Sequence, residues 1–195
     1  MGWTGVGIMA VALVVWAVVA YNRLQQLRNR VHNAYAQIDV QLKRRHDLIP
    51  NLVEVARGYM AHEAATLEAV TRARGAAVQA LDQARNQAAT GASLAAVASS
   101  EAALGSSLGR LMVLTEAYPG LKADAQMQQL SEAITSTENR VGYARQAYND
   151  QVLAFNDRSN HFPDLIVARL LGFVPLPMLQ ATESAAERQA PVVRF

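Results

Sequence analysis

Residues 2–21 read GWTGVGIMAVALVVWAVVAY and contain no charged side chain. At about 1.5 Å of rise per residue, a helix of this length spans the hydrocarbon core of a bilayer. Trp3 and Tyr21 stand near its two ends, where aromatic side chains favour the membrane interface. The stretch therefore predicts a single N-terminal transmembrane anchor over residues 1–21.

A cleaved signal peptide is the alternative interpretation of this stretch, because Val18 and Ala20 fit a small-residue cleavage site. Signal peptides carry basic residues before the apolar run, whereas here Arg23, Arg28 and Arg30 follow it. The pattern favours an anchor. Because basic residues concentrate on the cytoplasmic side, it also predicts a single-pass inner-membrane protein with its N-terminus outside and its helical domain in the cytoplasm.

The composition is that of a helical protein with one ordinary domain beside the anchor. Its residues are 51% hydrophobic but only 6% aromatic, and Ala, Leu and Val dominate the apolar half, which favours closely packed helices over sheets. Cys is absent, which excludes disulfides, thiolate nucleophiles and Cys-ligated metal centres. The basic residues gather beside the anchor, so membrane lipid is the expected partner and nucleic acid is not.

Beyond the anchor, apolar residues recur at alternating steps of three and four, as on one face of a helix. Four such stripes follow one another. Gly91 is expected to stop the second helix, Ser93 to cap the third, and the tripeptide at 118–120 to turn the chain before the fourth. The stripes are Leu24, Leu27, Val31, Ala34, Ile38 and Leu42; then Leu52, Val55, Tyr59, Leu67, Val70, Ala77, Leu81 and Ala84; then Leu94, Val97, Leu104, Leu108 and Leu111; and finally Met127, Leu130, Ile134, Thr137, Val141, Ala144, Tyr148, Val152 and Phe155.

These stripes predict an all-α fold, in which the anchor continues into an up-and-down antiparallel bundle of three to four long helices. Short connections force consecutive helices to lie antiparallel. The expected organisation is a transmembrane anchor at 1–21, a long-helix bundle at 22–160, and a short apolar helix with a C-terminal tail at 161–195.

The stretch KRRHDLIP at residues 43–50 leaves the first connection open. Asp47 as a cap and Pro50 in a first helical turn predict a tight turn here. The preferred alternative is a helix that bends at Pro50 and continues to about residue 89, because a hairpin at this point makes the second helix longer than the distance back to the bilayer. The basic residues at 43–45 predict a solvated helix end, with an anionic-lipid or partner site as the alternative.

Residues 21–63, YNRLQQLRNRVHNAYAQIDVQLKRRHDLIPNLVEVARGYMAHE, resemble the signature region of the LemA family of bacterial single-pass membrane proteins. Tyr35 and Met60 stand where the family has Trp and Ala. Further segments agree: ARG at 73–75, EAYPGLKA at 116–123, ENRVGYARQAYNDQV at 138–152, HFP at 161–163, GF at 172–173 and PVVRF at 191–195.

The resemblance implies a transmembrane helix followed by a bundle of long helices, and the family has no agreed biochemical activity. Similar proteins are associated with a membrane zinc metalloprotease of the heat-shock type, which the resemblance therefore implies as a partner. A relative takes part in building magnetosome membranes. Neither role is carried by particular residues of this chain.

None of the four histidines stands in a metal-binding motif. The sequence HEAAT at 62–66 lacks the second His of a zincin, and no Glu precedes a His by three residues as in di-iron bundles. His32 and His62, with Glu63, share a metal only if the helices form a hairpin about residue 47. A hydrogen-bonded polar pair explains the same residues, so no metal site is expected.

Glu101 lies on the apolar stripe of the third helix, where a lone carboxylate is costly unless it is paired. Arg85 or Gln79 is expected to satisfy it, in a structural contact rather than a proton-transfer role. Gly105 and Gly109 are expected to permit close helix approach rather than to cradle phosphate. The sequence therefore predicts no catalytic residue, no cofactor and no enzyme.

Two functions suit a tethered bundle without a catalytic site. The first is a scaffold or interaction protein, which forms a homo-oligomer and docks other membrane proteins through its heptad faces. The alternative is a membrane-shaping or lipid-organising oligomer. The tail after His161 is too short to span a bilayer, so it is expected to cover the bundle, meet a partner or lie at the membrane surface. Its apolar residues are Phe162, Leu165, Ile166, Val167, Leu170, Leu171, Phe173, Val174, Leu176 and Met178.

Overall fold

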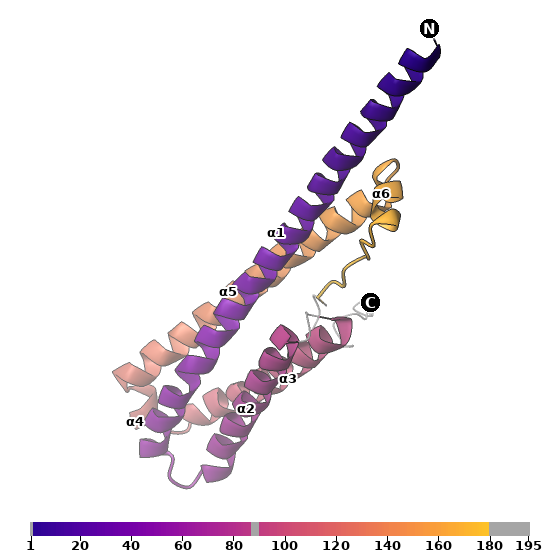
Figure 1. Cartoon of the computed structure of the whole chain (residues 1–195). Helices are drawn as coiled ribbons and strands as arrows, with labels where there is room; N and C mark the ends of the chain where they lie inside the picture. Colours follow the sequence, from indigo (N-terminus) through magenta and orange to yellow (C-terminus); the bar gives the residue numbers. More distant parts are fainter. Residues whose placement is uncertain (1, 87–89, 180–195) are drawn as a thin grey trace, which may run out of the picture. The chain divides into compact units, whose positions relative to one another are not determined.

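The computed structural model describes residues 2–86 and 90–179, which form six helices and no strand (Figure 1). The expected all-α bundle is confirmed in these residues. In chain order the helices are α1 (Gly2–Tyr59), α2 (Ala64–Asn86), α3 (Gly91–Thr115), α4 (Pro119–Lys122), α5 (Ala125–Asn160) and α6 (Asp164–Leu170).

The described residues form two compact units, and α1 and α5 contribute to both. Residues 2–36 and 146–178 make up the stem unit. Residues 37–86, 90–145 and 179 make up the bundle unit.

The first helix continues past residues 43–50, but it is shorter than the continuous alternative predicted. α1 is a single helix of 58 residues that passes through Pro50 without a break. Pro50 is exposed, so the lost backbone hydrogen bond lies on the solvent side of the helix. The continuous helix at 43–50 is confirmed, and the alternative turn at Asp47 is wrong. The continuation to about residue 89 is also wrong, because α1 ends at Tyr59.

The first turn lies at residues 60–63. Met60 N donates to Ala56 O at 2.9 Å, and Glu63 N donates to Met60 O at 3.1 Å, which closes α1 before α2 begins. The Met60 side chain is fully buried, so the residue that departs from the family pattern belongs to the core.

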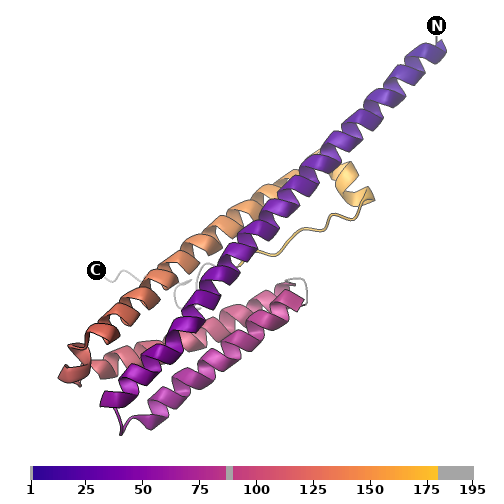
Figure 2. The same cartoon turned by 60° about the vertical axis from the view of Figure 1, so that its left-hand side comes forward.

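The helices α2 and α3 lie side by side as an antiparallel hairpin (Figures 1 and 2). Thr90 is the N-cap of α3, and its Oγ1 accepts a hydrogen bond from Ser93 N at 3.3 Å. Gly91 therefore begins α3 rather than stopping α2, and the expected cap at Ser93 is wrong. The Thr90 side chain lies three residues before the N–H that it satisfies, which is the geometry of an N-cap.

The turn signal at 118–120 leads into α4, a single helical turn with Pro119 at its first position. A missing N–H is harmless there, because the first N–H groups of a helix have no partner within it. Asp124 then precedes α5, and its Oδ1 accepts a hydrogen bond from Met127 N at 2.9 Å. The connection between α3 and α5 is therefore compact and ordered by its own residues.

The bundle unit is held together by a core to which each of its helices contributes. Burial of one such Leu or Val side chain contributes about 1.5–3 kcal/mol relative to exposure. The second, third and fourth predicted stripes supply most of the core residues, which are Ile49, Leu52, Val53, Ala56, Met60, Leu67, Val70, Ala77, Leu104, Leu108, Leu111, Leu121, Met127 and Ile134.

In the stem unit, α6 packs against α1 near the C-terminal end of the uncharged stretch (Figure 1). Val167 and Ala168 of α6 form a small core with Ala20 and Leu24 of α1. Trp16 packs at the edge of the same core. The short apolar helix expected after His161 is therefore present, and it covers the stem unit with one face.

A glycine ends α6 and turns the chain. Gly172 has a φ of +73°, which L side chains rarely adopt, and Phe173 N donates to Ala168 O at 2.9 Å. This turn brings the Phe173 ring onto Tyr21, with 5.8 Å between the ring centroids, and onto Phe155, at 6.2 Å. Three elements of the stem unit thereby share one aromatic contact.

The segment after α6 is fixed to α5 by side-chain hydrogen bonds to its backbone. Asn156 Nδ2 donates to Leu176 O at 2.9 Å, and Leu176 N donates to Asn156 Oδ1 at 2.8 Å. Tyr148 Oη donates to Pro177 O at 3.0 Å. Burial, together with the neighbouring Tyr35, raises the pKa of Tyr148 to about 12. The segment PVVRF at 191–195 lies outside the described residues.

Candidate functional site

A buried ionic cluster joins α1, α3 and α5 in the bundle unit. Arg45 Nη1 donates to Glu101 Oε2 at 3.1 Å, and His46 Nε2 donates to Glu101 Oε1 at 2.6 Å. Arg45 Nη2 reaches Glu138 Oε1 at 3.3 Å. Arg45, His46 and Glu101 are buried, whereas the Glu138 side chain is 60% exposed. Both carboxylate oxygens of Glu101 are therefore occupied by partners from one helix.

The helix α2 contacts the cluster through a side chain that reaches the backbone of α1. Arg74 Nε donates to the carbonyl oxygen of His46 at 2.7 Å. Next to the cluster, a Cβ at Gly105 would meet Arg45 Nη2 at an ordinary 3.7 Å, and one at Gly109 would meet nothing within 4 Å. The expectation that these two glycines permit close helix approach is therefore wrong.

The expected partners of Glu101 were wrong. Arg85 instead forms a bidentate salt bridge with Asp39, with Nε–Oδ1 and Nη2–Oδ2 distances of 2.7 and 2.8 Å. Glu101 is satisfied by Arg45 and His46 rather than by Arg85 or Gln79. The structural role expected for Glu101 stays a prediction, now with different partners.

The spacing of Arg45 in the sequence indicates that this residue is buried. Arg45 lies three residues after Leu42 and four before Ile49, so it continues the buried stripe of α1 across the polar stretch. The expectation of a solvated helix end at 43–45 is wrong for Arg45, which is 5% exposed. Lys43 and Arg44 are exposed as expected, but they are not at a helix end, because α1 continues past them to Tyr59.

The cluster links three helices through buried charges. A buried ion pair adds little net stability when intact, but removing one partner leaves an unpaired buried charge and costs about 3–5 kcal/mol. Such a penalty disfavours any packing in which Arg45 and Glu101 fail to meet. The arrangement fits a role in setting the register of α1 against α3.

Three histidines, His32, His62 and His161, are exposed, and His46 is buried in the ionic cluster. Because α1 runs unbroken through residue 47, the hairpin that a metal shared by His32 and His62 required is not formed. Across residues 2–86 and 90–179, no three His, Cys, Asp or Glu side chains gather as a metal ion needs.

Two tyrosines connect the α1–α2 turn to the α3–α5 connection. Tyr59 Oη donates to Asp124 Oδ2 at 3.0 Å, and Tyr118 Oη donates to Glu63 Oε1 at 3.4 Å. The hydrogen bond from Met127 N, followed by that from Tyr59, lowers the pKa of Asp124. Glu63 therefore has a structural partner in the bundle unit.

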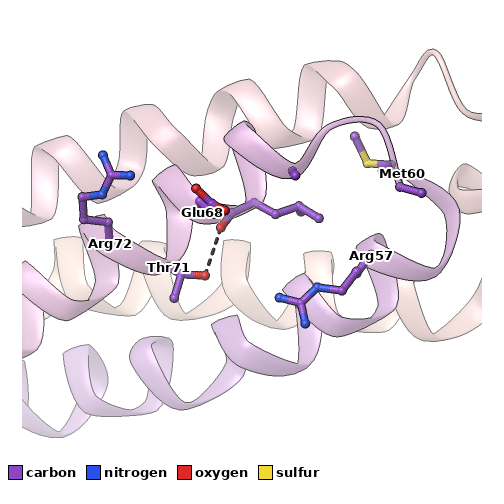
Figure 3. Close-up of a pocket in the computed structure, with 8 residues that line it drawn as sticks. Arg57, Met60, Glu68, Thr71 and Arg72 are labelled. Carbon is purple, nitrogen blue, oxygen red and sulfur yellow. Dashed lines mark hydrogen bonds between the residues drawn. The ribbon is translucent and has the colours of Figure 1, made fainter.

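An open groove of about 660 Å³ lies between the end of α1 and the first turns of α2. Figure 3 shows Arg57 and Arg72 on its opposite sides, with Glu68 and Thr71 along α2. Thr71 Oγ1 donates to Leu67 O at 2.9 Å, so this hydroxyl is used by its own helix. The residues that line the groove include no nucleophile with an adjacent base.

The N-terminal part of α1 presents the most continuous exposed apolar surface. Of the helices in the described part of the chain, α1 alone is long and apolar enough to cross a membrane. Between residues 3 and 21, its exposed large hydrophobic side chains are Trp3, Val6, Ile8, Met9, Val11, Leu13, Val14, Val15, Val18, Val19 and Tyr21.

A second exposed apolar surface, the tail face, lies on and around α6. It consists of side chains that point away from the contact with α1, and Phe162 and Leu170 are 80% and 78% exposed. The tail face is formed by Phe162, Ile166, Leu170, Leu171 and Val174.

Residues 34–195 match the family model described as the LemA family. The chain belongs to the LemA family. The resemblance of residues 21–63 is thereby confirmed, although the matched region of this LemA protein begins after the uncharged stretch.

This LemA protein is also similar to proteins described as magnetosome proteins. Magnetosome protein MamQ 2 and magnetosome protein MamQ 1 of Paramagnetospirillum magneticum (strain AMB-1) are each 24% identical to it over 178 residues. Magnetosome protein MamQ of Magnetospirillum gryphiswaldense is 22% identical over the same length. Each alignment covers 84% of this chain but 65% of the relative, so the match spans less than two thirds of their length. Together with the long apolar part of α1, the family indicates a membrane-associated protein.

Proposed function

We propose that this LemA protein is a membrane-tethered scaffold, which self-associates and docks other membrane proteins. The observation that carries this proposal is the continuity of α1. Its exposed apolar residues continue without a break into residues that are buried against other helices, from Ala20 and Leu24 through Leu52. One helix thereby joins a segment suited to lipid to the folded part of the chain.

The contacts of α6 support a retained anchor rather than a cleaved signal peptide. Cleavage after Ala20 would remove Trp16, Ala17 and Ala20 from the small core that Val167 and Ala168 complete. A folded core that spans the cleavage position is unsuited to a removable segment.

The topology is part of the proposal. Arg23, Arg28 and Arg30 are exposed on α1 just after the uncharged stretch. Basic residues in this position favour the cytoplasmic side, which supports an inner-membrane protein with its N-terminus outside and its bundle in the cytoplasm.

Docking uses surfaces other than the predicted heptad stripes. The α5 stripe is largely buried within the chain, as Ile134, Val141 and Val152 illustrate. Exposed apolar side chains such as Val113 and Tyr143 lie outside that core and are available for docking. A membrane zinc metalloprotease of the heat-shock type is the partner that the family resemblance favours.

Chemical crosslinking in native membranes, followed by identification of the captured proteins, tests the scaffold. We expect covalent dimers or higher multimers of the chain together with at least one other membrane protein. A variant lacking residues 2–21 is the control, and we expect it to lose the captured membrane protein. Recovery of uncrosslinked monomer alone, at a crosslinker dose that captures a known membrane complex, contradicts the proposal.

A second function, membrane shaping by an ordered oligomer, is favoured by the exposed tail face. Apolar surfaces that insert at the headgroup boundary bind in a curvature-sensitive way. Electron microscopy of the protein in lipid vesicles separates the two functions. Ordered rings or caps on deformed vesicles support shaping, whereas dispersed small oligomers on undeformed vesicles support the scaffold.

A further inference from the structure

We propose that the tail face is a lipid-binding surface, which lies in the membrane interface beside the anchor and takes anionic phospholipid. This inference rests on the proposed membrane tether. In this inference, the apolar residues around α6 contact a lipid bilayer rather than a second copy of the chain or a partner protein.

α6 contacts α1 close to the end of the uncharged stretch. α6 packs on Ala20 and Leu24, with Trp16 at the edge of the contact. The uncharged stretch ends at Tyr21, and about 20 helical residues span the hydrocarbon core. α6 therefore contacts α1 where hydrocarbon gives way to headgroups, within about one helical turn of 5.4 Å from the end of the stretch.

α6 has apolar side chains on both a buried face and an exposed face. Val167 and Ala168 are buried against α1, while Ile166, Leu170 and Leu171 remain exposed. The short helix therefore has one face on the protein and another without a covering among the described residues. An element of this kind lies with its outer face about 5–10 Å into the boundary between headgroups and acyl chains.

The exposed charged residues beside the tail face are mainly basic. Asp164, the acidic residue of α6, is buried and paired with Arg158. Arg169 is the exposed charged residue of α6, and Arg23 and Arg28 are exposed on the adjoining part of α1. The exposed charge of α6 is thus basic, and together with the two exposed arginines of α1 it outweighs the exposed Asp157 at the end of α5, which matches the anionic surface of a membrane.

The absence of Cys allows a direct test with the full chain in vesicles of phosphatidylcholine and phosphatidylglycerol. Single Leu170→Cys and Phe162→Cys variants carry an environment-sensitive fluorophore, since both side chains are more than three quarters exposed and accommodate a label. We expect a quencher attached high on the lipid acyl chain to reduce their fluorescence strongly. We expect aqueous iodide to reduce it little.

Two matched labels make the outcome decisive. Val11→Cys, near the middle of the uncharged stretch, reports on the tether when the quencher is instead attached near the end of the acyl chain. Ala102→Cys, exposed on α3, reports on a surface outside the tail face. Lipid quenching at Val11 and Leu170, with iodide quenching at Ala102, supports the inference. If Val11 is quenched by lipid but Leu170 and Phe162 are quenched by iodide, or by neither agent as under a protein partner, the inference is wrong and the tether stands. Iodide quenching at Val11 overturns the tether itself.

Discussion

Single residues explain why the most polar stretch of the chain forms part of its interior. Arg45 and His46 belong to the sequence KRRHDLIP, yet both are buried against Glu101. Spacing alone indicates that Arg45 faces inward, but no pattern in α1 identifies Glu101 as its partner, because the two residues lie 56 positions apart. Side-chain pairing between distant helices depends on packing that local sequence does not encode.

The Arg45→Met substitution tests the ionic cluster. It leaves Glu101 buried with one fewer partner, so we expect a loss of about 3–5 kcal/mol of stability. For a chain of this size, that loss lowers the melting temperature by on the order of 10 °C. Circular dichroism of the detergent-solubilised protein measures the change. Arg44→Met, an exposed neighbour with the same chemistry, is the control and should shift stability by under about 0.5 kcal/mol.

The Asp124→Asn substitution tests the contacts at the α1–α2 turn through their pH dependence. The pKa of Asp124 is lowered from its ordinary 3.8, first by the hydrogen bond from Met127 N and then by that from Tyr59. A lowered folded-state pKa means that the stabilisation is present above the ordinary value and is lost as pH falls through the folded-state value. We expect the wild type to melt higher than Asp124→Asn at neutral pH, and the difference to shrink below about pH 3.8. A difference that is unchanged down to pH 2 would show that the ionised carboxylate contributes nothing.

At the scale of whole elements, periodicity predicted which faces are buried better than where helices end. The stripe of α5 is buried at Met127, Ile134, Val141 and Tyr148, at the heptad spacing read from the sequence. Helix ends depended instead on single capping groups. Thr90 and Ser93 both carry a hydroxyl suited to an N-cap, and composition does not show that Thr90 is the one that caps α3, by accepting from Ser93 N.

The Val141→Asp substitution tests the α5 stripe. Val141 is buried, and an aspartate there is an unpaired charge, so we expect a loss of about 3 kcal/mol or more. Ser136→Asp places the same side chain at an exposed position of the same helix and should be nearly neutral. Thermal melts of the two variants give the comparison. Equal stability of both variants would mean that the stripe is not part of a core.

At the scale of the whole molecule, the fold class and the family followed from the sequence, but the division into two units did not. A stripe shows which face of a helix is buried and not which element buries it. The core that joins α6 to Ala20 and Leu24 depends on residues that lie about three quarters of the chain length apart. The domain boundaries at residues 21 and 160 stay predictions, as do the oligomer and its partners.

The central claim is that α1 tethers the bundle to a membrane and crosses it once, and thiol accessibility tests this most directly. Thr4→Cys and Ala102→Cys are introduced singly into the Cys-free chain and treated with a membrane-impermeant thiol reagent in intact cells or spheroplasts. We predict that Thr4→Cys reacts in intact cells and that Ala102→Cys reacts only after the membrane is permeabilised. Reaction of Ala102→Cys in intact cells, or protection of Thr4→Cys until permeabilisation, contradicts the account.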